Sequence, residues 1–207
     1  MTERIKIFGA TPSPYTQKML SVFRYRHIPY TVHNGDIANK IAKLGVEVPK
    51  PVLLPTLLLK DAAGELVATT DSTPIIKRLE NEFKERGIIP DDPALAFINY
   101  LLEDFGDEWV TKYMFHYRWY FEEDADIAGT ILPLVDLAIN TPNELHAQYK
   151  ELIAKRQIDR LWVVGSNDET AELIDLSYKR FLKLMEEHLL VSPFLLGNKP
   201  SSSDFSF

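Results

Sequence analysis

The sequence predicts a mixed α/β domain with the element order β-α-β-α-β-β-α, followed by an all-helical domain. Over residues 1–86, short apolar runs alternate with segments whose apolar residues recur at helical spacing. The stretch 87–93 (GIIPDDP) is typical of a linker, and residues 94–207 show helical periodicity throughout. Because the last two strands form a hairpin, the sheet must combine parallel and antiparallel pairs.

The first two strands and the helix between them follow from local patterns. Ile5 to Phe8 is a short apolar run flanked by charges and a glycine, which predicts a strand. Ser13 and Pro14 are typical of a helix start, with serine as the N-cap and proline in the first turn. Pro29 ends this helix, and residues 30–33 are the second predicted strand.

The remaining elements of the first domain are a short helix, a hairpin and a closing helix. Residues 36–44 form the predicted short helix. Residues 57–60 and 65–69 are strands joined by a turn that contains a glycine. The segment 71–74 (DSTP) opens the closing helix, which we expect to end at Gly87.

The second domain is expected to be helical from residue 94 onward. Its opening helix carries a long apolar stripe formed by Ala94, Phe97, Ile98, Leu101, Phe105 and Trp109. Further helices are predicted at about 126–139, 142–160 and 168–190.

Composition excludes several function classes. The formal net charge of −7 argues against non-specific nucleic-acid binding and against binding to anionic membranes, since both need a basic face. The absence of cysteine excludes protein thiol nucleophiles, disulfides and thiolate metal sites. The five histidines show no paired ligand spacing, so we expect no metal site. A charged N-terminus without a long apolar span predicts a soluble, cytoplasmic protein.

Three short segments of the first domain carry candidate chemistry, and each has a plainer alternative. The Ser13 hydroxyl at a helix start can donate to a thiolate, or can serve only as an N-cap. A cis bond before Pro55 would turn the backbone of Leu54 toward a ligand, although trans is the commoner state. Asp71 and Ser72 open a helix whose N-terminus can hold an anion, or can simply be capped.

Taken in this order, the three segments resemble those of the glutathione transferase superfamily. Residues 13–16 (SPYT) resemble the glutaredoxin-type Cys-Pro-Tyr-Cys motif with hydroxyl residues in place of both cysteines. Residues 54–57 resemble the cis-proline motif, and residues 71–72 resemble the acid–serine pair. Residues 194–205 resemble the motif that opens a buried helix of the second domain. The resemblance implies a thioredoxin-like first domain and covers the chain except for 122–166.

The resemblance also implies residue roles at a glutathione-binding site. Ser13 would contact the glutathione sulfur and lower the pKa of the thiol, with Tyr15 and Thr11 as alternatives. Leu54, which precedes Pro55, would pair its backbone with the cysteinyl part of glutathione.

The γ-glutamyl and glycyl ends of glutathione would lie on other residues. Ser72 would bind the γ-glutamyl carboxylate, with Asp71 near the ammonium group. Lys40, Lys43 and Lys50 are the three candidates for the glycyl carboxylate.

An electrophile site would lie between the two domains of such a protein. Tyr113, His116 and Tyr120 share one face of a predicted helix by their spacing, and with Tyr15 they are candidates to line an aromatic pocket. The alternative is that this aromatic face is ordinary helix core.

The resemblance therefore implies an enzyme, a glutathione transferase that joins the glutathione thiolate to a small electrophile. Glutathione would be the co-substrate, no metal would be required, and the protein would form a homodimer. The domains would be 1–86 and 94–207, joined by the linker 87–93, with the second domain cut short three residues after Asp204. A non-catalytic binding or scaffold protein and a glutathione-dependent isomerase or dehalogenase are the alternatives.

Overall fold

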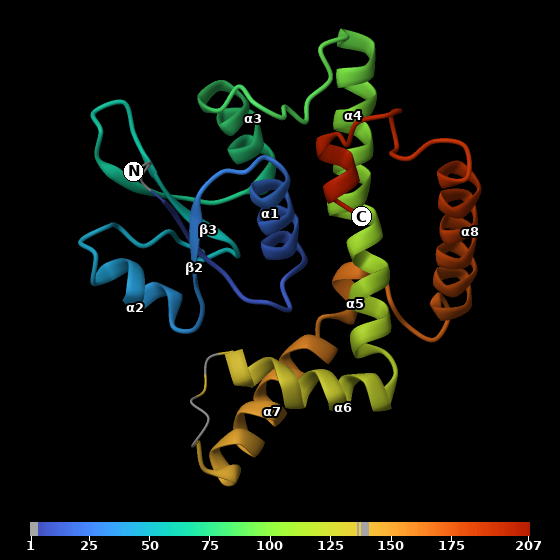
Figure 1. The fold of residues 1–207 in the computed structure, drawn as a ribbon. Helices are drawn as coiled ribbons and strands as arrows, with labels where there is room; N and C mark the ends of the chain where they lie inside the picture. Colours follow the sequence, from blue (N-terminus) through green and yellow to red (C-terminus); the bar gives the residue numbers. More distant parts are fainter. Residues whose placement is uncertain (1–3, 136, 138–140) are drawn as a thin grey trace. The chain divides into compact units, whose positions relative to one another are not determined.

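The computed structural model describes residues 4–135, 137 and 141–207. The chain forms two compact units, of which the first comprises the residues through Asn99 and the second begins at Tyr100 (Figure 1). The division therefore falls inside a helix that starts at Pro93. Among the described residues, no helix is both long enough and apolar enough to cross a bilayer.

The first unit contains a four-stranded mixed sheet, as the sequence predicts. Strand β1 (Ile5–Phe8) runs parallel to β2 (Tyr30–His33) and antiparallel to β3 (Thr56–Lys60). Strand β4 (Leu66–Thr69) pairs antiparallel with β3, which gives the order β2-β1-β3-β4.

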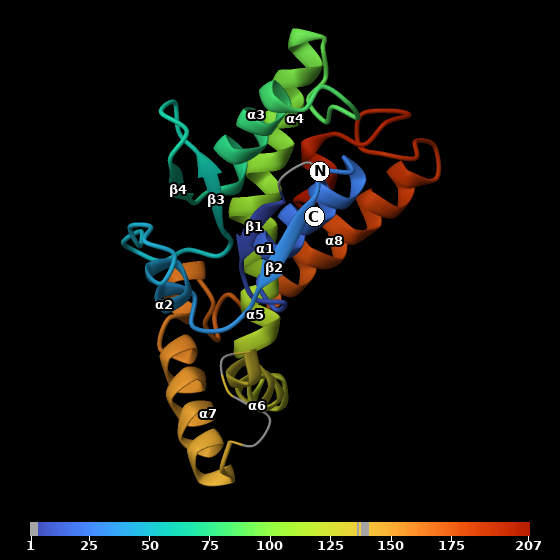
Figure 2. The ribbon, with the colours of Figure 1, turned by 60° about the vertical axis from the view of Figure 1, so that its left-hand side comes forward.

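Three helices cover the two faces of this sheet. Helices α1 (Pro14–Tyr25) and α3 (Ser72–Glu82) lie on one face, and α2 (Ile37–Ala42) lies on the other (Figures 1 and 2). Ile41 of α2 packs with Phe8 and Leu58 in a buried cluster. Since side chains alternate along a strand, their sequence neighbours in β1 and β3 face α1 and α3.

Helix α3 ends at Glu82, five residues before the predicted end at Gly87. Phe83 already has an extended backbone, with φ −120° and ψ 115°. The buried Arg26 stabilises this early end, because its Nη2 donates to the Phe83 carbonyl at 2.5 Å and its Nη1 pairs with Glu80 Oε1 at 2.8 Å. A cation that binds the last carbonyls of a helix opposes the negative end of the helix dipole.

One long helical run starts at the end of the first unit and continues into the second unit, where shorter helices follow it. Helix α4 (Pro93–Phe105) passes through a π-helical turn (Gly106–Val110) into α5 (Thr111–Trp119). The later elements are α6 (Glu122–Ile131), a 3-10 turn (Leu132–Val135), α7 (Asn143–Ile158), a 3-10 turn (Leu161–Val164), α8 (Ala171–Leu189) and a 3-10 turn (Ser202–Phe205).

The helix predicted at 126–139 starts and ends earlier than expected. Three acidic residues, 122–124, occupy the first turn of α6, where their negative charges are attracted by the positive end of the helix dipole and stabilise the helix start. Pro133 follows the helix and lies in the 3-10 turn. Positions 136 and 138–140 of the predicted helix lie outside the described residues. The predictions at 142–160 and 168–190 correspond to α7 and α8.

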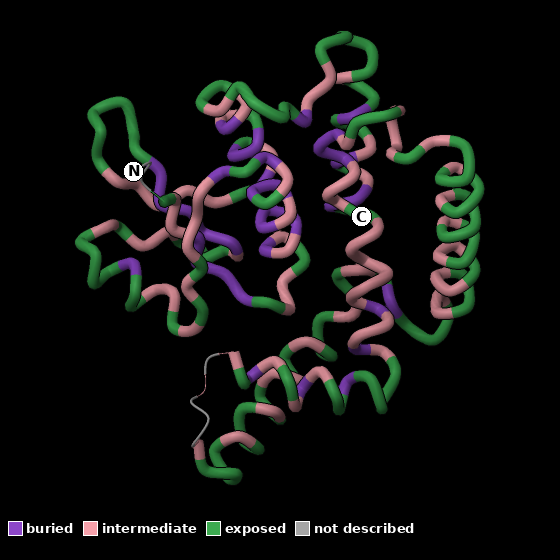
Figure 3. The backbone as a smooth tube through the Cα atoms, in the orientation of Figure 1, coloured by how far each residue is buried: buried purple, intermediate pink, exposed green. Residues whose placement is uncertain are grey.

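Burial differs between the two units. In Figure 3 the buried segments are concentrated in the sheet and α1 of the first unit. Helices α7 and α8 contain no buried residue among those described. The predicted apolar stripe of the opening helix is largely exposed, with Phe97 at 60% and Trp109 at 58%.

The Asp204 carboxylate caps the C-terminal turn. The Asp204 carboxylate accepts from the Ser201 backbone N–H at 2.7 Å and from the Leu195 N–H at 2.8 Å. The Ser201 hydroxyl donates to the same carboxylate, at 2.8 Å, rather than capping the N–H of residue 204. Only one half of a capping box is therefore formed.

Candidate functional site

The strand register brings the predicted glutathione-binding segments to one edge of the first unit. Phe8 pairs with Thr56, and Leu57 pairs with Thr69. The segment containing Ser13 follows β1, the Leu54–Pro55 peptide precedes β3, and Asp71–Ser72 follows β4. Because β3 is antiparallel to both neighbours, all three segments emerge at the same edge of the sheet.

Ser13 is the N-cap of α1. Its Oγ accepts a hydrogen bond from the Thr16 N–H at 3.3 Å, and its backbone is extended. The cap uses a lone pair of the hydroxyl oxygen and leaves the O–H proton available to donate. The two interpretations from the sequence are therefore compatible, since one hydroxyl can cap the helix and still donate to a thiolate.

The backbone before Ser13 is held close to α1 by Thr16. Thr16 is 1% exposed, and its Oγ1 accepts from the Ala10 N–H at 3.4 Å. A Cβ added at Gly9 would lie 2.6 Å from Thr16 Cγ2, so this position has no room for a side chain. The loop that carries Ser13 is thus held at its start by the bond between Ala10 and Thr16, and at its end by the cap bond of Ser13.

The peptide bond between Leu54 and Pro55 is cis. This is the state that the family resemblance implies and not the trans state that base rates favour. Pro55 is buried and Leu54 is half-buried. In the described part of the chain, no backbone group hydrogen-bonds to the Leu54 N–H or carbonyl. Both groups of Leu54 are therefore available to a ligand with an extended backbone.

Asp71 caps α3 with an unusual backbone conformation. Its Oδ1 accepts from the Thr73 N–H at 3.2 Å, and its φ of +74° lies in a region that non-glycine residues seldom adopt. Such conformations cost about 1–3 kcal/mol and occur preferentially at functional sites. Asp71 is exposed, so its carboxylate can meet a ligand from solvent.

Ser72 is the first residue of α3 and is only 6% exposed. Within the described residues, its hydroxyl has no hydrogen-bond partner. The hydroxyl is not among the fully buried side-chain atoms that lack a partner, so its oxygen stays accessible from solvent. The hydroxyl and the backbone N–H of Ser72 together fit a carboxylate ligand.

The three lysine candidates all lie on exposed positions. Lys40 Nζ donates to the Asn34 carbonyl, which holds it beside the start of α2. Lys43 follows α2, and Lys50 precedes a second cis bond, at Pro51. Nothing in these contacts distinguishes one lysine as the partner of the glycyl carboxylate.

The aromatic face of α5 is engaged with the later part of the second unit. Tyr113 Oη lies 2.6 Å from Ser177 Oγ, and the Tyr120 hydroxyl donates to Asp168 Oδ1 at 3.0 Å. His116 is 1% exposed, and its Nδ1 lies 2.7 Å from Ser166 Oγ.

The ring of His116 stacks on Tyr120 with centroids 4.7 Å apart. Burial lowers the pKa of His116, and the nearby Asp175 carboxylate opposes that shift in part. The neighbouring Tyr117 donates to Asp175 Oδ1 at 2.7 Å, and burial followed by this bond raises its pKa to about 12. These contacts favour the helix-core interpretation for His116, while Tyr15 lies half-buried in the first turn of α1.

Comparison with known proteins supports the interpretation of the first unit. Residues 7–87 match the family model of the glutathione S-transferase N-terminal domain. Glutathione S-transferase U4 of Arabidopsis thaliana is 28% identical over 108 residues, which cover 52% of this chain and 46% of that protein. The aligned region is thus about half the length of this curated relative.

Solved structures share the fold of the whole chain. A glutathione S-transferase from Rhodospirillum rubrum F11 has a TM-score of 0.56 at 14% identity, over 98% of this chain and 74% of that one. A glutathione S-transferase from Methylobacterium radiotolerans, in complex with glutathione sulfonate, has a TM-score of 0.51 at 18% identity, over 99% and 76%. These findings support a glutathione transferase-like protein. The α/β unit followed by helices is the thioredoxin-like plus all-helical fold expected from the sequence.

The candidate site offers hydrogen-bond donors and the positive ends of two helices. No three histidine, aspartate or glutamate side chains gather as a metal site in the part of the chain that the structure describes. The starts of α1 and α3 each place a serine at the positive end of a helix dipole. Such an arrangement suits a ligand that carries a carboxylate and an ionisable thiol.

Sequence reasoning missed Gly9, Thr16 and Arg26. A glycine directly after a strand is a signal for close backbone approach, so the sequence could have singled out Gly9. That signal does not predict which residue approaches it. Arg26 carried no signal, because its partners lie 54 residues or more farther along the chain.

Proposed function

We propose that the chain binds glutathione along the edge formed by Ser13, the Leu54–Pro55 peptide and Ser72, and that it transfers the glutathione thiolate to a small electrophile. The observation that carries the proposal is the Ser72 hydroxyl, which belongs to a residue that is only 6% exposed, has no partner among the described residues and sits at a helix N-terminus. A ligand carboxylate would supply the missing hydrogen bond.

The backbone of Leu54 supports the same ligand. An extended peptide can pair with its N–H and carbonyl in the manner of an added strand. With the γ-glutamyl carboxylate on Ser72 and the ammonium group near Asp71, the cysteinyl sulfur would lie toward the start of α1. Ser13 then donates its hydroxyl proton to the sulfur and favours the thiolate, assisted by the helix dipole.

The transfer step needs no protein nucleophile. The thiol proton leaves to solvent, the sulfur electron pair forms a C–S bond, and the leaving group departs from the same carbon with its bonding pair. Most of the rate gain would come from thiol ionisation and from holding the two reactants together. We assign Tyr15 of the first unit to the part of the site that holds the electrophile, since it follows Ser13 by two residues.

Isothermal titration of the full chain with glutathione tests the binding half of the proposal. Ser72→Ala removes a charge-assisted hydrogen bond of about 1.5–3 kcal/mol, which corresponds to roughly a 10- to 100-fold weaker Kd. Because the hydroxyl has no protein partner among the described residues, the same variant should unfold at the wild-type temperature. Ser21→Ala, in the middle of α1, is the matched control and should bind normally.

Conjugation of glutathione to an activated aryl halide tests the catalytic half. A transferase is supported if the chain turns over these substrates and if Ser72→Ala lowers activity mainly by raising KM. Tight glutathione binding without turnover would instead indicate a binding protein or a more specialised glutathione-dependent reaction. Absence of glutathione binding would refute the proposed site altogether.

A further inference from the structure

Asn34 and Gly35 lie in the connection between β2 and α2. Asn34 is the one asparagine of the chain that precedes a glycine. Neither residue belongs to a helix or a strand, and Asn34 is exposed. Gly35 has a φ of +66°, in a region that favours glycine. The connection therefore presents a side-chain amide next to a peptide nitrogen that no neighbouring Cβ shields.

Both of these groups lack hydrogen bonds. In the part of the chain that the structure describes, neither the Asn34 carboxamide nor the Gly35 N–H has a partner. The bonds between β1 and the end of β2 stop just before this point, where the Gly9 N–H donates to the His33 carbonyl at 3.1 Å. The Gly35 nitrogen is thus not held in the sheet, and it is free to approach the carboxamide carbon of the preceding residue.

The backbone carbonyl of Asn34 is bound by a cation. The Lys40 ammonium donates a hydrogen bond to its oxygen. This oxygen belongs to the same peptide group as the Gly35 nitrogen, so loss of the N–H proton would spread negative charge over both atoms. A cation that donates to the oxygen stabilises that anion and makes the N–H more acidic. Lys40 therefore activates the nitrogen as a nucleophile.

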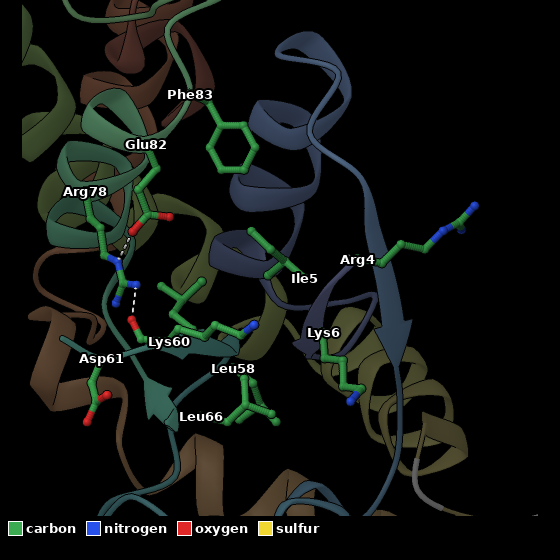
Figure 4. A pocket seen from close by; sticks show the side chains of 11 residues that line it. Arg4, Ile5, Lys6, Leu58, Lys60, Asp61, Leu66, Arg78, Glu82 and Phe83 are labelled. Atoms are coloured by element: carbon green, nitrogen blue, oxygen red, sulfur yellow. Dashed lines mark hydrogen bonds and ion pairs between the residues drawn. The ribbon is translucent and has the colours of Figure 1, made fainter. Parts of the chain in front are cut away.

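A cation on a backbone carbonyl is not distinctive by itself. At the end of β3, the Arg78 guanidinium donates to the Lys60 carbonyl in the same manner (Figure 4). Lys60 has no side-chain carbonyl that the next nitrogen could attack, so that contact leads to no reaction. At Asn34 the same kind of contact coincides with an amide side chain and a following glycine, and asparagine is among the thermolabile residues of proteins.

The neighbouring ionisable groups are bound elsewhere or neutral. The Asp36 carboxylate accepts from the Asn39 backbone N–H at 3.3 Å and from Asn39 Nδ2 at 2.5 Å, so its charge is directed into the start of α2. Burial, followed by the charges of Lys40 and Lys6, lowers the pKa of His33, so the His33 ring is neutral at mildly alkaline pH. Lys40 is therefore the charge that acts most directly on this peptide group.

We propose that Asn34 is a site of spontaneous deamidation, promoted by Lys40. The Gly35 nitrogen loses its proton to water and attacks Cγ of Asn34. A C–N bond forms, and the side-chain nitrogen takes up a proton and leaves as ammonia. Water then opens the resulting succinimide ring, at Cγ to give aspartate or at the backbone carbonyl to give isoaspartate. In sum, a water molecule is consumed and ammonia is released.

The two products change the connection between β2 and α2. Each places a carboxylate next to Lys40 in place of a neutral amide. Isoaspartate also routes the backbone through the side chain, which adds a carbon atom to the main chain. Both changes fall just before α2, whose buried Ile41 packs against Phe8 and Leu58. The proposal stands whether or not the chain binds glutathione.

The test is a time course of the folded full chain at mildly alkaline pH, followed by digestion at acidic pH and peptide mass spectrometry. We expect the Asn34 peptide to exchange NH for oxygen in two separable products, one of which elutes with the peptide of an Asn34→Asp variant. Asn39, whose amide donates to Asp36, and Asn167, whose Oδ1 accepts from two N–H groups, are internal controls and should stay intact. An Asn34 that stays intact, or equal deamidation of the controls, would overturn the proposal.

Two lysine variants test the role of Lys40. Lys40→Gln should slow deamidation of the folded chain about fivefold, the effect of a single charge on a neighbouring anion in water. In urea, Lys40→Gln and the wild type should react at nearly equal rates, because the contact with the Asn34 carbonyl is lost. Lys43→Gln removes an exposed lysine just after α2 and should leave the rate unchanged. An unchanged rate in folded Lys40→Gln, or an equal loss in Lys43→Gln, would contradict the assigned role of Lys40.

Discussion

Replacing Ser13 by alanine separates the two roles of its hydroxyl. The cap bond to the Thr16 N–H is 3.3 Å long, at the weak end of the range for such bonds, so its loss should cost about 0.5–1 kcal/mol of stability. A hydrogen bond to a charged acceptor is worth about 1.5–3 kcal/mol. At about 1.4 kcal/mol per pKa unit, its loss should raise the pKa of the bound glutathione thiol by roughly one to two units.

The assay is the pH dependence of aryl halide conjugation, supported by the ultraviolet absorbance of the bound thiolate. Below the pKa of the bound thiol, Ser13→Ala should be roughly 10- to 100-fold slower than the wild type, and the difference should narrow as the pH rises and the thiol ionises in both. Ser13→Thr keeps a hydroxyl and a cap, so it should retain most of the activity. Identical pH–rate profiles for Ser13→Ala and the wild type would refute the reasoning, and Tyr15→Phe and Thr11→Ala would then be the variants to examine.

Three further predictions concern the supporting structure. Arg26→Met should destabilise the first unit by about 3 kcal/mol in denaturant unfolding, because Glu80 and the carbonyls at the end of α3 lose their buried partner. Gly9→Ala should cost about 1–3 kcal/mol, since the new Cβ would meet Thr16 at 2.6 Å. For His116, burial lowers the folded-state pKa, so the unfolded state binds a proton more readily as the pH falls below about 6.5. Thermal unfolding of the wild type should therefore occur at a lower temperature at pH 5.5 than at pH 7.5, and His116→Gln should reduce the difference.

Matched variants serve as controls for these three predictions. Arg24→Met, which removes an exposed side chain from the same helix, should change stability by less than about 0.5 kcal/mol. The cost of Gly9→Ala should fall in a chain that also carries Thr16→Ala, and full additivity of the two changes would contradict the steric explanation. His27→Asn, at an exposed position with φ +56°, should leave the pH dependence as it is.

The arrangement of the first unit could be predicted from local patterns. The proline at the first turn of α1, the glycine in the hairpin and the Asp71 cap each specify a boundary through backbone chemistry. The end of α3 could not be predicted in this way, because Arg26 fixes it from a distant position in the chain. Nor could the sequence reveal that the Ser72 hydroxyl has no partner among the described residues, since that depends on what the fold places around it.

The aromatic helix shows where periodicity stops being informative. Spacing correctly places Tyr113 and His116 on a helix, and Tyr120 is the residue that caps its end. Spacing cannot distinguish a ligand pocket from packing against α8 and the residues before it. What distinguishes a pocket from helix core is the hydrogen-bond partner of each polar side-chain group, and the partners here are Ser177, Ser166 and Asp168. None of these partners is near α5 in sequence.

A crystal structure of the chain soaked with glutathione tests the central claim most directly. The account predicts a γ-glutamyl carboxylate within hydrogen-bond distance of the Ser72 hydroxyl, peptide hydrogen bonds to Leu54, and the sulfur within reach of Ser13 Oγ. Glutathione bound elsewhere, or a Ser72 hydroxyl that still has no partner in the glutathione-bound protein, would contradict it.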